Sequence, residues 1–273
     1  MPRKSRRGTG KGSKRKSPPS RVKESAGEKA AENPLVSVII PAANEKRTIA
    51  AVIREARRVH PQTEVLVIAN GSTDGTPSIS RKMGARVIQY AERLGHDVGR
   101  AVGALHARGS ILLFTDGDIV VRAGELHPFV RAVQQGVDLA LNDYSGPTNT
   151  QEVHSVVLAK HVLNQALFRA DLKGASMTAV PHAISRRFME KIGAEALAVP
   201  PLAHAMAVAK GLKVQLVHNV PVGQRNPLRR HIKPDPLEGL IVGDHLEALG
   251  WLFQSTNARG TFPDLGRLRD SVG

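Results

Sequence analysis

Two short apolar runs, each followed at once by a polar turn containing glycine, constrain the fold of this chain most. The first spans residues 65–69 and leads into the turn at 70–76, and the second spans residues 111–114 and leads into 115–118. Such runs are typical of strands buried on both faces of a parallel sheet. Ligands of open α/β sheets bind just beyond the carboxyl ends of the strands, so both turns are candidate ligand sites.

A third strand and a helix precede these runs. Residues 35–40 are apolar enough for a strand that Pro41 stops, and residues 48–60 have the apolar spacing of a helix. The order strand, helix, strand, turn, helix, strand predicts a right-handed parallel unit. The second turn holds Asp116 and Asp118 on either side of a glycine, and two such carboxylates can bind a hard divalent cation.

Three segments together resemble the family 2 glycosyltransferases of the GT-A fold. They are the strand and its continuation at 35–49, the turn at 70–76 and the Asp-Gly-Asp turn at 116–118. The resemblance covers about residues 35–120, the donor half of such an enzyme. It implies an α/β fold of GT-A type, with a Rossmann-like, mostly parallel sheet flanked by helices. It also implies a nucleotide-diphosphate sugar donor, a UDP-sugar being the first choice, and Mn²⁺ or Mg²⁺ as cofactor.

The resemblance assigns roles to particular residues. It places Pro41, Ala42 and Glu45 in the lining of the nucleoside pocket, and Asn70, Gly71 and Asp74 in the turn that meets the base. Arg100 closes on the base or on a phosphate. Asp116 faces the ribose, and Asp118 holds the metal that bridges the diphosphate. From the residues alone, Asp74 is equally a cap for the following helix. The family usually has an acidic pair where this chain has Ala69 and Asn70.

The acceptor half departs from the resembled family. Inverting members place a general base ahead of the helix expected here at 202–211, but this chain has Pro200 and Pro201 there. Asp143 and His182 are the substitute candidates for catalysis. A retaining enzyme similar to the glucosyl-3-phosphoglycerate synthases needs no such base and often takes a further metal ligand from a late histidine, for which His218 and His231 are available. A catalytically inactive nucleotide-sugar-binding module is the other alternative.

The remaining elements follow from periodicity. Helices are expected at 97–107, 125–135, 155–168, 185–192, 202–211 and 237–253, and strands at 85–90, 137–142, 177–180 and 213–217. The chain then divides into a tail (1–33), a glycosyltransferase domain (34–225, with donor half 34–120 and acceptor half 121–225) and a C-terminal basic loop and helix (226–273). The loop is a candidate clamp for a diphosphate or for an anionic acceptor.

Charge and composition limit the possible partners and location of this chain. Residues 1–33 hold 11 Lys and Arg against 3 Asp and Glu with few apolar residues, so this tail is expected to be disordered. The tail could serve to keep the protein soluble, to bind an anionic membrane or to bind nucleic acid. With no cysteine, no stretch of about 18 apolar residues and no secretory signal, the chain is expected in the cytoplasm, either free or peripheral at the membrane.

Overall fold

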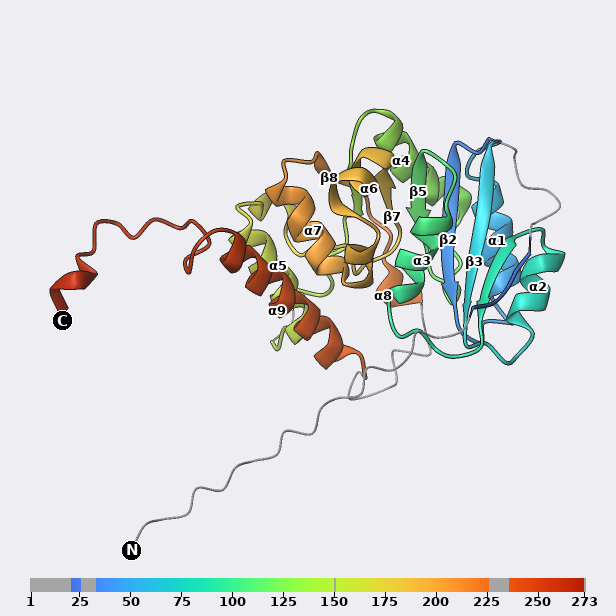
Figure 1. Cartoon of the computed structure of the whole chain (residues 1–273), viewed down its shortest axis with the longest axis horizontal. Coiled ribbons are helices and arrows are strands. Elements are labelled where there is room, and N and C mark those ends of the chain that lie inside the picture. Colours follow the sequence, from blue (N-terminus) through green and yellow to red (C-terminus); the bar gives the residue numbers. More distant parts are fainter. Residues whose placement is uncertain (1–20, 26–32, 150, 226–235, 273) are drawn as a thin grey trace, which may run out of the picture.

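A computed structural model describes residues 21–25, 33–149, 151–225 and 236–272 of the 273-residue chain. One eight-stranded sheet runs through the domain in the order β1-β4-β3-β2-β5-β7-β6-β8 (Figure 1). The strands are β1 (Arg21–Ser25), β2 (Val36–Ala42), β3 (Thr63–Asn70), β4 (Arg86–Tyr90), β5 (Ile111–Phe114), β6 (Leu139–Asn142), β7 (His182–Ser185) and β8 (Val214–His218).

The sheet is parallel at its centre. Strands β4, β3, β2 and β5 pair in parallel, β7 runs antiparallel between β5 and β6, and β8 pairs in parallel with β6. The carboxyl ends of β2, β3, β5, β6 and β8 therefore lie along the same edge. This edge is where the two glycine-containing turns predicted from the sequence lie.

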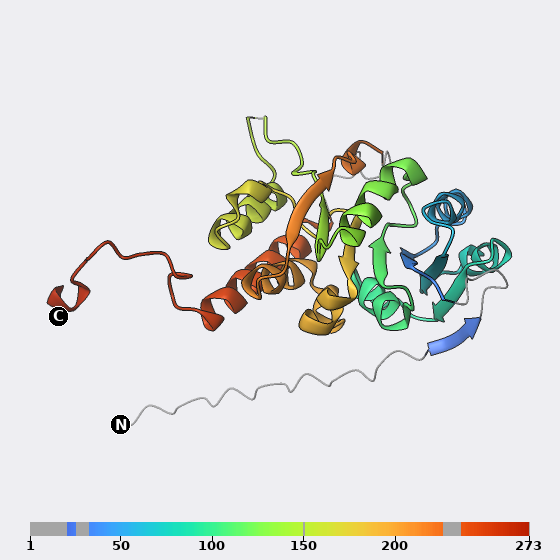
Figure 2. The same cartoon turned by 90° about the horizontal axis from the view of Figure 1, so that it is seen from above.

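Helices cover both faces of the sheet (Figure 2). They are α1 (Ile49–Arg57), α2 (Thr76–Lys82), α3 (Val98–His106), α4 (Ala123–Gln134), α5 (Ser155–Ala166), α6 (Arg186–Ile192), α7 (Pro200–Ala209), α8 (Val222–Arg225) and α9 (Glu238–Ser255). One apolar core joins α1 and α4 to the sheet, and another joins α3, α6 and α7 to its opposite face. Side chains of β2 alternate between the two cores, with Ile39 facing α3 and Val38 and Ile40 facing α1. Both faces of the strand are therefore buried, and its buried hydroxyl, Ser37, donates to Glu64 Oε1 at 2.6 Å.

The expected elements agree with the structure to within about three residues at each end, with one exception. Residues 177–180 form a turn rather than a strand, in which the Ala179 amide donates to Ser176 O at 3.0 Å. Met177 is fully buried there, so its apolar character reflects core packing rather than strand pairing. The strand follows instead at β7, where His182–Ser185 finds partners on both sides.

The terminal segments differ in how much of them is described. Five residues of the predicted tail form β1, which pairs antiparallel with β4 at the edge of the sheet. Residues 1–20, 26–32 and 226–235 lie outside the described residues, and with them the rest of the tail, the basic loop and His231. Within the described ranges, no helix combines the length and apolar character needed to cross a membrane.

Two glycines let α3 lie close against β2. A Cβ built on Gly99 would be 3.2 Å from Pro41 Cβ, and one built on Gly103 would overlap Ile39 Cγ2. Ile39 is fully buried, so it has no free space to move into. We expect Gly103→Ala to lower the free energy of unfolding by about 1–3 kcal/mol through overpacking, measured by urea denaturation.

Gly250 provides the matched control for this prediction. It lies inside α9, and no heavy atom comes within 4 Å of a Cβ built on it. Gly250→Ala should therefore leave stability unchanged or raise it by about 0.5–1 kcal/mol, because alanine favours the helix. Equal effects at both positions would contradict the close approach of α3 to β2.

Candidate functional site

A pocket lies at the carboxyl edge of the sheet, where β2, β3 and β5 end. Its walls come from the loops after these strands and from the start of α3. The lining residues are Pro41, Ala42, Ala43, Glu45, Asn70, Gly95, His96, Asp97, Gly99, Arg100, Asp116, Gly117 and Asp118. Seven residues assigned to the donor site by sequence, among them Asp116 and Asp118, therefore share one pocket.

The Asp-Gly-Asp turn is held against the loop after β2. The Gly117 amide donates to Pro41 O at 3.2 Å, and Thr48 Oγ1 donates to Gly117 O at 2.7 Å. A Cβ on Gly117 would lie 3.0 Å from Ala42 Cβ, which is closer than side chains normally pack. Glycine therefore lets the two loops touch, and this contact holds Asp116 and Asp118 at the pocket.

Arg100 is buried in the pocket wall between two carboxylates. Its guanidinium lies 2.5 Å from Asp97 Oδ1 and 3.1 Å from Asp116 Oδ1. Burial opposes the charged form, but Asp97 and Asp116 outweigh it and raise the pKa of Arg100 above its ordinary value. The guanidinium thus offsets part of the negative charge of the pocket and holds Asp97 and Asp116 in place beside the Asp-Gly-Asp turn.

Asp74 braces two loops and does not line the pocket. Its Oδ2 accepts from the Lys46 amide at 3.0 Å, and its Oδ1 accepts from both the amide and the hydroxyl of Thr76. Burial alone raises the pKa of Asp74, but the hydrogen bonds from Thr76 and Lys46 overcome this and hold it below the ordinary value. These contacts agree with the alternative interpretation, in which Asp74 organises the start of α2.

The Asn70 side chain lines the pocket and also holds the loop before α3. Its Nδ2 donates to Gly95 O at 3.1 Å, and its Oδ1 accepts from the Leu94 amide. Gly71 follows at φ +64°, and a Cβ there would lie 2.9 Å from the Arg93 amide nitrogen. Both residues thus fix the loop that carries Asp97, and Gly71 contributes through its backbone alone.

His182 lies behind the pocket rather than in it. Its ring is stacked on Phe114 with centroids 4.9 Å apart, its Nδ1 is 3.1 Å from Ala179 O, and 1% of its surface is exposed. Burial, and after it the charge of Arg100, lower the pKa of His182 to about 3. The ring is neutral at physiological pH but has no access to an acceptor in this conformation.

The structure does not bring Asp143 or His218 to the pocket. Asp143 follows β6 and His218 ends β8 at the same edge, but β6 and β8 are two and three strands away from β5. At about 4.8 Å per strand, His218 is roughly 14 Å from the Asp-Gly-Asp turn, too far to share an ion with Asp118. The His218 ring instead contacts the edge of Phe129, with ring centroids 6.4 Å apart.

Asp97 belongs to the site and was not found from the sequence. It adopts φ +60° just before α3, is 7% exposed, and pairs with Arg100 three residues later. The spacing of an acid three residues ahead of Arg100 at a helix start was the available signal. Burial, and after it the negative charge of Asp97, raises the pKa of Asp244 in α9 to about 6.

The donor atoms at the pocket fit a divalent cation held jointly with a ligand. Asp116 and Asp118 offer carboxylate oxygens, and no group of three or more His, Asp or Glu side chains suited to a metal occurs in the described part of the chain. Mg²⁺ characteristically binds through one or two carboxylates and completes its shell with substrate phosphates and water. A site of this kind is what the two carboxylates can form.

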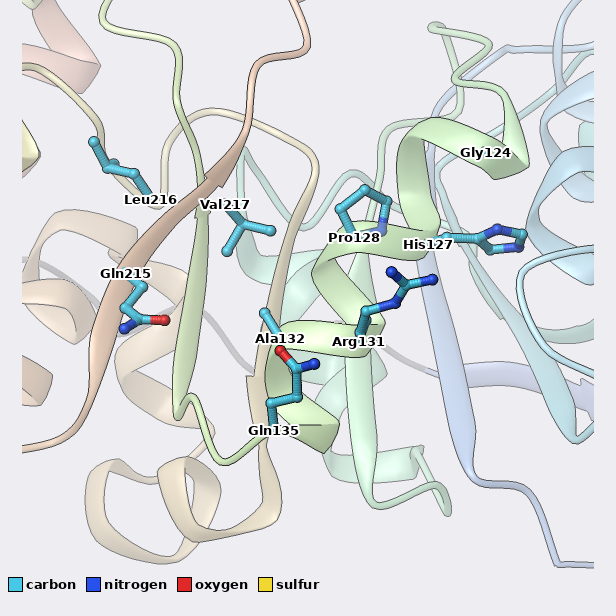
Figure 3. Close-up of a pocket in the computed structure, with 9 residues that line it drawn as sticks. All are labelled: Gly124, His127, Pro128, Arg131, Ala132, Gln135, Gln215, Leu216 and Val217. Carbon is cyan, nitrogen blue, oxygen red and sulfur yellow. The ribbon is translucent and has the colours of Figure 1, made fainter.

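Another cavity lies between α4 and β8, on a different part of the molecule (Figure 3). Its lining residues include Gln215 and Val217 of β8, Pro128 and Arg131 of α4, and Gln135 just after α4. No carboxylate lines it, and His127 points away from β8, with its Nε2 3.2 Å from Arg58 O. None of the predicted site residues borders this cavity, so the candidate site is the pocket at the sheet edge.

The mostly parallel sheet, with an acidic pocket at its carboxyl edge, defines the class as an α/β protein of GT-A type. The family comparison makes this specific. Residues 37–192, more than half of the chain, match the glycosyl transferase family 2. The chain belongs to this family.

Among curated proteins, two relatives illustrate the range of similarity. A dolichyl-phosphate hexose transferase of Haloferax volcanii is 31% identical over 108 residues, covering 40% of this chain and 47% of the relative. A polyprenol monophosphomannose synthase of Mycolicibacterium smegmatis is 26% identical over 172 residues, covering 59% and 65%. The first curated relatives are thus matched over about half of their length or less.

Among solved structures, glucosyl-3-phosphoglycerate synthase of Mycobacterium tuberculosis is similar in fold. Its complex with Mn²⁺, UDP and glucosyl-3-phosphoglycerate superposes with a TM-score of 0.58 at 21% identity, covering 85% of this chain and 82% of that protein. The same enzyme has been solved with Mn²⁺, UDP-glucose and phosphoglyceric acid. At this identity the likeness establishes the GT-A fold.

Proposed function

We propose that this protein transfers a hexose from a UDP-sugar to an acceptor, with Mn²⁺ or Mg²⁺ as cofactor. The observation that carries the proposal is the convergence of Asp116, Asp118 and Arg100 in one pocket at the carboxyl edge of the sheet. The solved relatives that bind UDP or UDP-glucose together with Mn²⁺ support the same choice of donor and metal.

Each part of the pocket has a task in this proposal. Pro41, Ala42 and Glu45 flank the nucleoside, while Asn70 keeps the opposite loop in place. Arg100 lies beside Asp116 and contributes positive charge toward the ribose and diphosphate side of the donor. Asp118 binds the metal. When bound, the metal neutralises charge that develops on the leaving diphosphate.

A retaining reaction fits the acceptor side better than an inverting one. Pro200 and Pro201 are buried at the start of α7, where an inverting enzyme would place its base. Four carboxylates line the pocket, those of Glu45, Asp97, Asp116 and Asp118. Asp97 and Asp116 are engaged with Arg100. The leaving diphosphate of the donor would then accept the proton of the acceptor hydroxyl as the new glycosidic bond forms and the sugar–phosphate bond breaks.

This proposal predicts the anomeric outcome. Proton NMR of the first-formed product should show the donor's own anomeric configuration. Asp143→Asn and His182→Ala should each leave measurable turnover, because neither side chain reaches the pocket. An inverted product combined with loss of turnover in either variant would identify a relocated general base instead.

The test of the function is a panel of nucleotide sugars with Mn²⁺, scored for hydrolysis and for thermal stabilisation of the full chain. We expect UDP-hexoses to give both signals and each signal to disappear when EDTA removes the metal. Stabilisation without hydrolysis or transfer to any acceptor would favour a nucleotide-sugar-binding module without catalysis. No response to any nucleotide sugar would reject the proposed function.

A further inference from the structure

Asp97 has a backbone conformation and a side-chain orientation that are unusual for an aspartate in front of a helix. It lies at φ +60° and ψ −23°, in the left-handed region that residues other than glycine rarely adopt. An aspartate before a helix usually accepts hydrogen bonds from the first free amides, but the Asp97 side chain accepts none of them. Such a conformation is kept where surrounding contacts impose it, often at a functional site. The carboxylate of Asp97 therefore has a task other than capping α3.

The Asp97 carboxylate lies against two basic side chains. Its Oδ1 is 2.5 Å from Arg100 Nη1, and its Oδ2 is 3.5 Å from His96 Nε2. The side chains of Asp97 and Arg100 are each 4% exposed, so solvent and salt screen their attraction little. Neither Asp97 Oδ1 nor Arg100 Nη1 forms an aligned hydrogen bond with any described residue. Opposite charge, rather than hydrogen-bond geometry, therefore holds the pair together.

The backbone on both sides of Asp97 fixes its position. The loop before it is tied to the end of β3, where Asn70 Nδ2 donates to Gly95 O at 3.1 Å and Asn70 Oδ1 accepts from the Leu94 amide. Directly after it, α3 packs closely on β2, and Gly99 leaves the room for this contact. Asp97 is thus held firmly enough to set the place of another side chain.

Arg100 brings positive charge to the Asp-Gly-Asp turn. Its Nη2 lies 3.1 Å from Asp116 Oδ1, a longer contact than the one with Asp97. Burial lowers the pKa of Arg100, but the charge of Asp97, followed by those of the two aspartates of the turn, raises it above its ordinary value. A divalent cation bound at the turn is repelled by this guanidinium unless a further carboxylate offsets its charge. Asp97 is placed to provide that carboxylate.

We propose that Asp97 is a positioning residue of the donor site: it holds the Arg100 guanidinium at the pocket wall and offsets its charge, so that the Asp-Gly-Asp turn keeps its negative charge for a divalent cation. This role rests on the proposed function, because the cation and the nucleoside diphosphate are the ligands of that site. When the charge of Asp97 is removed, Asp116 and Asp118 become the counter-ions of a buried guanidinium. They then bind a divalent cation more weakly, although neither has itself been changed.

The test is isothermal titration of Mn²⁺ into the full chain at saturating UDP, for the unchanged protein and for Asp97→Asn. Asparagine has nearly the shape of aspartate and tolerates a positive φ, so the substitution removes charge alone. We expect the Kd of Mn²⁺ to rise about tenfold, because a neighbouring charge at this range commonly changes the cation affinity of a carboxylate by that much. The Kd of UDP without metal should not rise, because the lost charge has the same sign as UDP. A purely structural role of Asp97 would weaken UDP binding both with and without the metal.

Asp264→Asn is the matched control for this substitution. Asp264 also pairs with an arginine three residues later, Arg267, but it is partly exposed and does not line the pocket. Its substitution should therefore leave the Kd of Mn²⁺ unchanged.

The same substitution in an Arg100→Gln background shows whether Asp97 acts through Arg100. If it does, Asp97→Asn should change the Kd of Mn²⁺ less than about twofold once the guanidinium is absent, because two coupled residues do not have additive effects. If Asp97→Asn alone fails to fold, the double variant should recover the fold, since it removes both buried charges together. A double variant that fails to fold while Arg100→Gln folds would contradict the role.

Two binding results would also overturn the role of Asp97. One is Mn²⁺ binding in Asp97→Asn as tight as in the unchanged protein. The other is a loss of about tenfold that persists in the Arg100→Gln background, since the charge of Asp97 would then act on the cation directly. Failure of the proposed function gives a different result, in which Mn²⁺ does not strengthen UDP binding even in the unchanged protein. The donor site, and with it the role of Asp97, is rejected in that case.

Discussion

Acidification from pH 6.5 to pH 4.5 is expected to destabilise this protein by several kcal/mol. Burial, as the largest cause, lowers the pKa of His182 and His204 to about 3 and that of His245 to about 4. In the unfolded chain these groups titrate near 6.5, so between pH 6.5 and about 4 the unfolded state binds more protons. Stability is therefore fully present above pH 6.5 and lost as the pH falls, by about 1.4 kcal/mol per pH unit for each histidine.

Asp244 opposes this trend. Its pKa is raised to about 6 in the folded protein, so it binds its proton more strongly when folded, and its contribution to stability is lost as the pH rises from 4 to 6. Because Asp244 is partly exposed, solvent screening makes its effect smaller than that of any one buried histidine. The net prediction remains a steep loss of stability in acid, measured by urea denaturation at a series of pH values.

His204 provides the variant that isolates the cause. It is fully buried in α7, and neither ring nitrogen has a hydrogen-bond partner among the described residues. His204→Leu should therefore be at least as stable as the unchanged protein at pH 7.5, because it removes unsatisfied polar atoms. The free energy of unfolding should also fall less steeply with decreasing pH, by about the contribution of one histidine. His127→Leu, at an exposed histidine of α4, is the control, and an equal change in slope in both variants would contradict the explanation.

Asp118→Asn is expected to reduce kcat/KM for the UDP-hexose on the order of 10³-fold, since removing a group that stabilises developing charge typically has an effect of this size. The amide is nearly isosteric but lacks the negative charge that a divalent cation needs. Stability should change little, because Asp118 is only partly buried at the end of β5. Asp171→Asn is the matched control, an exposed carboxylate that pairs with Arg169. A similar loss in the control, or none in Asp118→Asn, would contradict the assigned role.

The sequence predicted the elements whose signals are local. The runs that became β2, β3 and β5 are mainly apolar because both faces of these strands are buried, and the turns after β3 and β5 are marked by glycine and aspartate. Asp116 and Asp118 were predictable at this edge, because they follow a strand whose carboxyl end lies there. Arg100 lies in α3, and only the family resemblance placed it with them.

What the sequence did not predict depends on contacts between distant residues. The Lys46 amide donates to Asp74 from 28 residues away, and the Phe114 ring stacks on His182. Neither of these contacts has a local signal. The residues at 177–180 have the composition of a strand, but the neighbouring positions beside β5 and β6 are taken by His182–Ser185. His218 was considered for its place after a strand, but the strand order separates it from Asp118.

The central claim is that Asp118 and a donor diphosphate bind one divalent cation together in the pocket at the sheet edge. Isothermal titration of UDP into the protein with and without Mn²⁺, repeated for Asp118→Asn, tests it most directly. We expect Mn²⁺ to strengthen UDP binding at least about tenfold in the unchanged protein, a coupling of about 1.4 kcal/mol, and to have no effect in Asp118→Asn. UDP binding that is equally strengthened by Mn²⁺ in both proteins would contradict the claim.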